Sequence, residues 1–172
     1  MVEQSRLSEN VLNLEHLLVK EFRLLQELIE TSRAEQQALL KSSDQVMRLV
    51  EDKEVQLDEL GLVENSRRQV VQSLMVDLNI RSETSSVSEL LPHLEPATAG
   101  RIKRLSEGLN SLVLEARELN RNNQAVAAIK LDWVKSVQHL LIGLSQTDHG
   151  YHSPTSAPNL RDTPSQTLNF RV

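Results

Sequence analysis

The residues best suited to chemistry lie near the end of the chain. His149 and His152 stand three positions apart, a spacing at which two imidazoles on a helix can share a metal ion, and Asp148 is beside them. Gly150 and Pro154 interrupt this stretch, so no helix is expected there. The sequence has no Gly-x-Ser-x-Gly elbow, no Glu-x-x-His pair and no glycine-rich phosphate loop. We therefore expect no catalytic residue, no metal site, no cofactor and no enzyme activity.

A second polar feature is the asparagine-rich segment 118–124, which interrupts the leucine repeat of the last third of the chain. Asparagine is a mediocre helix former, because its side chain competes for backbone hydrogen bonds. Asn123 falls on the repeat itself and Asn120 lies one turn earlier, whereas Asn122 is most simply a solvated residue. A polar residue at a core position costs stability and sets register or partner choice. We predict this register and specificity role for Asn120 and Asn123, and we expect Asn123→Leu to raise thermal stability.

The composition favours a helical chain without a large aromatic core. Of the 172 residues, 39% are hydrophobic but only 2% are aromatic, so Leu and Val must build the core. Residues 1–60 hold 13 acidic and 7 basic side chains, a net charge of −6, while residues 61–172 hold 11 and 12, a net charge of +1. Nucleic-acid binding requires a basic stripe, so no nucleic-acid partner is expected. The absence of cysteine excludes disulfides and zinc–thiolate sites.

Two long stretches without proline carry the apolar repeats that predict helices. The first repeat predicts a helix over about 7–41, whose apolar seam weakens where Ser32 and Glu35 occupy it. Residues 42–44, Ser-Ser-Asp, predict a break or a kink, with one of these polar side chains capping the next helix. That second helix is predicted over about 44–79. It carries Leu57 and Lys53 on its seam and Gly61 at a bend or a close contact.

The remainder contains a short helix, a long helix and a tail. Residues 86–89 match the capping-box pattern and predict a short helix over about 87–91. The last long helix is predicted over about 98–145. Residues 147–172 are rich in Ser, Thr, Pro and Asn, so we expect a flexible tail after a helical domain spanning 1–146. The fold class is all-α: an elongated antiparallel helical bundle or coiled-coil hairpin of three long helices plus one short helix.

Apolar residues of the last helix form a stripe wider than one seam. Trp133, the only tryptophan, is most simply explained as core filler between helices. Alternatively, it anchors a partner helix, because aromatic anchors dominate interface energies. The N-terminus lacks the order of a secretion signal, and no window reaches the roughly 18 apolar residues of a membrane span. We expect a cytoplasmic protein without membrane insertion, and the sequence leaves its oligomeric state open.

The order of these parts resembles the FlgN-type flagellar export chaperones over about residues 8–145. Three features carry the resemblance: the leucine helix through Ala38-Leu39-Leu40 with its polar break at 42–44, the continuation over 46–53 followed by Leu57, Leu60 and Arg67-Arg68, and the segment 118–123 before a terminal helix. The leucine repeats alone are generic, so the order of parts is the more specific signal.

The resemblance implies a cytoplasmic, non-enzymatic chaperone. Such proteins bind the C-terminal amphipathic helices of the hook–filament junction proteins, keep them unassembled and deliver them to the flagellar type III export apparatus. By position, the partner-binding surface lies on the last helix and comprises Val126, Ile129, Trp133, Val137, Leu140, Leu141 and Leu144. The alternative is a structural coiled-coil tether or scaffold subunit without a chaperone role, which would also account for the leucine repeats.

Overall fold

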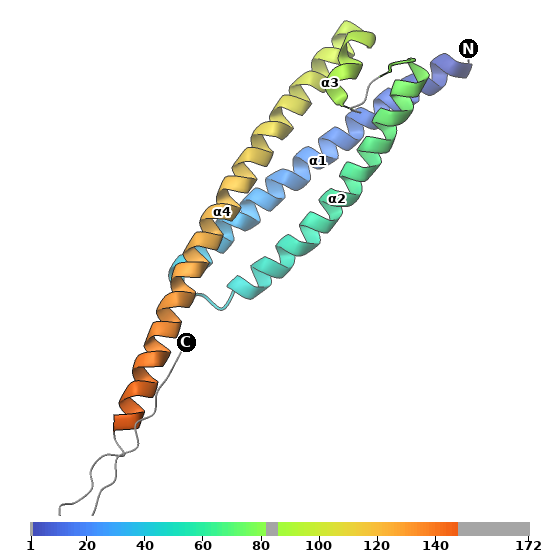
Figure 1. The fold of residues 1–172 in the computed structure, drawn as a ribbon. Coiled ribbons are helices and arrows are strands. Elements are labelled where there is room, and N and C mark those ends of the chain that lie inside the picture. Colours follow the sequence, from blue (N-terminus) through green and yellow to red (C-terminus); the bar gives the residue numbers. More distant parts are fainter. Residues whose placement is uncertain (1, 82–85, 148–172) are drawn as a thin grey trace, which may run out of the picture. The chain divides into compact units, whose positions relative to one another are not determined.

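The computed structural model describes the backbone of residues 2–81 and 86–147 and the side chains of residues 6–81 and 86–142. This part of the chain contains helices and no strand (Figure 1), so the all-α prediction is confirmed. The elements are α1 (Val2–Lys41), α2 (Val46–Asp77), α3 (Val87–Leu90), the 3-10 helix η1 (Leu91–His93) and α4 (Pro96–Thr147). The tail predicted over 147–172 lies outside the described residues, apart from Thr147.

The chain divides into two compact units, Met1–Leu131 and Asp132–Val172, and α4 supplies residues to both. Helix α4 begins at Pro96, two residues before the predicted start. Proline suits the first helical position, because the N–H that it lacks would have no partner within the helix. The single helical domain expected over 1–146 stays a prediction.

Helices α1 and α2 run antiparallel within the first unit. Asn10 Nδ2 donates to Asp77 Oδ2 at 3.1 Å. Much further along α1, Glu35 Oε2 accepts from Lys53 Nζ at 2.7 Å. The partner's number therefore falls along α2 as the residue number rises along α1, as in a helical hairpin.

The segment between α1 and α2 is a true break. Ser42 adopts the left-handed conformation with φ 54°, Ser42 N donates to Leu39 O at 3.3 Å, and Ser43 N donates to Ala38 O at 3.0 Å. These two bonds form the Schellman motif that closes helix C-termini. Ser43 Oγ accepts from the free amide of Gln45 at 3.3 Å, as predicted, but the N-cap position is Gln45 rather than Ser43 or Asp44, and the Gln45 side chain makes no capping bond.

Residues 96–131 of α4 run parallel to α1. Arg101 Nε pairs with Glu15 Oε1 at 2.9 Å, and further along both helices Asn123 Nδ2 donates to Ser32 O at 2.8 Å. The first unit is thus a three-helix bundle in which α2 runs opposite to α1 and α4.

The apolar core joins all three long helices and the short helix α3. Its fully buried leucines and isoleucine each contribute roughly 1.5–3 kcal/mol relative to exposure. The core comprises Leu14, Leu18, Leu25, Leu28, Val71, Leu74, Met75, Leu90, Ile102 and Leu109. The predicted capping box of α3 is present, and Ser86 N donates to Glu89 Oε2 at 3.4 Å, which orients Leu90 into this core. Leu57, predicted on the seam of α2, is instead 50% exposed.

Two glycines within helices have opposite surroundings. A Cβ atom added at Gly61 would meet no atom within 4 Å, so this residue marks no close contact. A Cβ atom added at Gly108 would lie 2.9 Å from Cε2 of Phe22, so here α1 and α4 approach closely. The close contact expected at Gly61 is therefore absent, and the alternative of a bend there stays a prediction.

We expect Gly61→Ala to raise the free energy of unfolding by about 0.5–1 kcal/mol, because alanine loses less backbone entropy in a helix and finds open space there. Gly108→Ala gains the same propensity but must displace the Phe22 ring. Urea denaturation of both variants measures the difference. A Gly108→Ala protein as stable as Gly61→Ala would show that the α1–α4 contact is loose.

Candidate functional site: a buried polar cluster and the exposed apolar residues of α4

The asparagine segment of α4 faces the bundle at one position and solvent at another. Asn123 is 2% exposed, as its place on the leucine repeat predicts, whereas Asn122 is exposed. Asn123 Nδ2 donates to Ser32 O at 2.8 Å and to Glu35 Oε2 at 2.7 Å. Its Oδ1 atom is buried and accepts no hydrogen bond. The amide is therefore oriented as a double donor toward α1.

Glu35 is the centre of this polar cluster. Its side chain is 9% exposed, and Oε2 accepts both from Asn123 and from Lys53 Nζ at 2.7 Å. Lys53 in turn donates to Asn120 Oδ1 at 3.1 Å. The cluster thus ties one residue of α1 to one of α2 and two of α4. Burying a carboxylate without such donors would cost several kcal/mol of stability. Each donor therefore constrains the position of its helix along the bundle axis.

The sequence identified the residues of this cluster one by one, on three different apolar seams, and did not show that they meet. Ser32 and Glu35 were seen as a weakening of the first seam, Lys53 as a polar residue on the second and Asn123 as one on the third. Their common signal is that each interrupts an apolar seam. Because α2 runs antiparallel to α1 and α4 runs parallel to it, these polar residues meet at the same level along the bundle axis. Only the packing of the three helices brings them together.

A second polar contact fixes α4 against the end of α1. Lys130 Nζ donates to the carbonyl oxygen of Leu39, and to Ser42 Oγ at 2.8 Å. The last carbonyl groups of a helix lack intrahelical partners and carry the negative end of the helix dipole, so a lysine there is favourable. Lys130 therefore holds the first unit's part of α4 at the α1–α2 turn.

Glu21 and Arg67 form another ion pair between α1 and α2. Arg67 Nε lies 2.8 Å from Oε1 and 3.0 Å from Oε2 of Glu21, whose side chain is buried. Burial raises the pKa of the Glu21 carboxyl above its ordinary value of 4.5, while the hydrogen bond and the charge of Arg67 oppose that rise.

The apolar residues predicted to bind a partner are largely exposed. Ile129 is 70% exposed, Trp133 67%, Leu140 64% and Leu141 59%, whereas Val126 and Val137 are half-buried. Trp133 is therefore not core filler. Leu131, Val134 and Ile142 are exposed as well, and none of them was predicted as part of the partner-binding surface. The side chain of Leu144 lies outside the described residues.

Other candidate groups add no chemistry to the described part of the chain. Among the side chains of residues 6–81 and 86–142, no cluster of three His, Asp or Glu is arranged to hold a metal ion. His149 and His152 lie outside these residues. None of the described helices has the length and hydropathy of a membrane span.

The chain matches a known protein family. A family model described as FlgN protein matches residues 10–158, which is most of the chain. The chain belongs to the FlgN family. No curated protein and no solved structure gives a match. Membership in the FlgN family confirms the resemblance seen in the sequence and supports a general role as a chaperone in flagellum biogenesis.

The hydrogen bonds of Asn123 reverse the stability effect expected from the sequence. We expect Asn123→Leu to lower the free energy of unfolding by about 1–3 kcal/mol, because Ser32 O and the Glu35 carboxylate each lose a donor. Asn122→Leu on the exposed side should change it by less than about 0.5 kcal/mol. Urea denaturation measures both, and a stabilised Asn123→Leu protein would show that the cluster contributes specificity alone.

The raised pKa of Glu21 predicts a pH-dependent difference from Glu21→Gln. Between the ordinary and the raised pKa, the folded state binds more protons than the unfolded chain. The free energy of unfolding of the natural protein therefore falls, relative to Glu21→Gln, as the pH rises from 4.5 through the raised value. Arg67→Met should extend the upper limit of this window to higher pH, since Arg67 opposes the rise of the Glu21 pKa. A natural protein that gains stability over Glu21→Gln through this window would contradict the prediction.

Proposed function

We propose that this FlgN-family protein is a cytoplasmic chaperone that binds the C-terminal amphipathic helices of hook–filament junction proteins. It would keep these proteins from assembling early and deliver them to the type III export apparatus. The observation that supports the proposal most directly is the exposure of large apolar side chains on α4, led by Trp133 at 67% and Leu140 at 64%.

The spacing of these side chains suits a helical partner. Ile129, Trp133 and Leu140 stand four and seven positions apart, so they fall on one face of α4. Val134 and Leu141, also seven apart, lie about a quarter-turn round the helix and widen that face. An amphipathic helix recognises such a face through its own residues at three- and four-residue spacing. No catalytic group is needed, because burying the apolar stripe of the client is sufficient to block its self-assembly.

Trp133 is the residue that we expect to contribute most to client affinity. Tryptophan is enriched among residues whose loss weakens interfaces most, because it buries a large rigid ring. Val126 is half-buried within the first unit, so we place the centre of the client surface on Trp133, Leu140 and Leu141.

The contacts of Lys130 determine how the surface should be tested. Removing residues 126–145 would delete the client surface and also the lysine that binds the end of α1. Loss of binding after such a deletion would not separate the two effects. Single substitutions of exposed side chains in the full chain avoid this problem.

We expect Trp133→Ala to weaken binding of a purified hook–filament junction protein by about 30-fold, the effect of losing about 2 kcal/mol from an interface anchor. Leu140→Ala should weaken it as well, whereas Leu114→Ala should not. Leu114 is a matched control, because it lies on the same helix and is 66% exposed. Isothermal titration calorimetry measures the affinities, and circular dichroism checks that each variant stays helical.

Two results would contradict the proposal. If Trp133→Ala and Leu140→Ala bind the junction protein as tightly as the natural chain, the client surface lies elsewhere. If the natural chain binds no junction protein at all, a scaffold or tether role without chaperone activity becomes the better explanation.

A further inference from the structure

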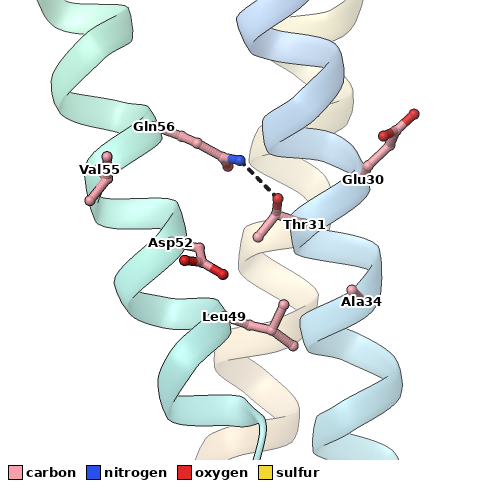
Figure 2. A pocket seen from close by; sticks show the side chains of 7 residues that line it. All are labelled: Glu30, Thr31, Ala34, Leu49, Asp52, Val55 and Gln56. Carbon is pink, nitrogen blue, oxygen red and sulfur yellow. Dashed lines mark hydrogen bonds between the residues drawn. The ribbon is translucent and has the colours of Figure 1, made fainter.

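The first unit carries an open groove between α1 and α2, and none of the residues that line it belongs to the proposed client surface. Its volume is about 490 Å³. Figure 2 shows Leu49, Asp52 and Gln56 pointing from α2 toward α1, whose Thr31 and Ala34 form the other side, while α4 passes behind. The contact that closes the groove at one end is the hydrogen bond from Gln56 Nε2 to Thr31 Oγ1 at 3.0 Å.

Apolar side chains line this groove and continue along the exposed face of α2. Leu49, Ala34 and Val55 line it, and Val55 is 68% exposed. Leu62 stands seven positions, about two turns, beyond Val55 on the same face and is 69% exposed. Exposed apolar side chains scattered singly need no explanation, but a row of them beside a groove indicates an interaction surface.

The charges around the groove are acidic. Glu30 and Asp52 line it, while Glu27 precedes Thr31 by one turn and Glu51 precedes Val55 by one turn. Among the described residues, none of these four carboxylates forms an ion pair. Elsewhere in the first unit, by contrast, Glu15, Glu21 and Glu35 are each paired with a basic residue of a neighbouring helix. Two basic residues of α2 lie near Asp52: Arg48 stands one turn before it, and Lys53 follows it but is buried and paired with Glu35.

From this charge pattern, we infer that the α1–α2 groove docks a basic amphipathic helix of a second protein partner, distinct from the chaperone's client. The apolar residues of such a helix would cover Leu49 and Val55, and its Lys or Arg side chains would pair with Glu30 and Asp52. Its donors could also satisfy Gln56 Oε1, a buried atom that accepts no hydrogen bond.

Charge also argues against a second copy of this chain, or the chain's own residues 148–172, as the occupant of the groove. A second copy of this chain carries a net charge of −5, and its docking would bring acidic surfaces together. The chain's own residues 148–172 contain two acidic and two basic side chains, so they offer no net positive charge. A basic partner is the occupant that the groove complements.

The test uses the full chain and a designed, fluorescein-labelled Leu/Lys helix of about 18 residues, five helical turns. Fluorescence anisotropy at low ionic strength measures its affinity, and the same helix with Glu in place of Lys is the probe control. Val55→Asn should weaken binding of the basic helix at least about fivefold, whereas Val76→Asn should not. Val76 is the matched control, because it is 71% exposed on the same helix.

A second pair of variants separates the groove from general charge attraction. The double variant Glu30→Gln/Asp52→Asn should weaken binding about tenfold or more, since it removes two pairing partners. Glu9→Gln/Glu118→Gln changes the net charge equally at exposed acidic residues elsewhere and should have less than about a twofold effect. Equal weakening by both double variants would overturn the inference.

Trp133 distinguishes the groove from the client surface within the same experiment. It is the only tryptophan of the chain, and the probe contains none, so the emission of Trp133 reports on α4 alone. Binding in the groove should leave that emission unchanged. A shift in emission together with unchanged affinity in Val55→Asn would place the probe on α4 and overturn the inference, as would the absence of any binding by the basic helix.

Discussion

A carboxylate buried among three helices must be neutralised where it lies, and Glu35 sets this condition for the first unit. Its Oε2 atom receives Lys53 from α2 at 2.7 Å and Asn123 from α4 at 2.7 Å. Leucine contacts tolerate sliding by a turn, because one leucine can replace another in a seam. A buried charge that needs two particular donors does not tolerate such sliding, because the donors would no longer reach it. The cluster therefore specifies the register of the three helices relative to one another, while the apolar core supplies most of the stability.

The acidic residues of the first unit include two groups, one paired across helix interfaces and one beside the α1–α2 groove. Glu15, Glu21 and Glu35 each pair with a basic side chain across a helix interface. The acidic side chains beside the α1–α2 groove form no ion pair among the described residues. The exposed apolar residues of α4 around Trp133 have few charged neighbours on their own face. A chaperone with these two surfaces would hold an apolar client helix by one and meet a basic partner through the other.

This division suits a protein that works by covering surfaces. Large exposed apolar residues are a liability in a monomer, and their concentration on α4 is explained if a client helix buries them. Within the first unit, Asn123 and Lys130 hold α4 against the last turns of α1 and the turn that follows it. A helix presents its side chains at fixed spacing, which reduces the entropy lost when a partner helix docks.

The sequence by itself determined the all-α class, the approximate limits of the helices, the capping box of α3 and the position of Asn123 on a buried seam. These follow from local periodicity and capping, which neighbouring residues specify. Only the tertiary structure decided that Ser42 ends α1 in a full turn and that Trp133 is exposed. It also brought Glu35, Lys53 and Asn123 together. Burial and pairing depend on which helix faces which, and a single helix's periodicity is the same whether its apolar face is covered by the chain itself or left for a partner.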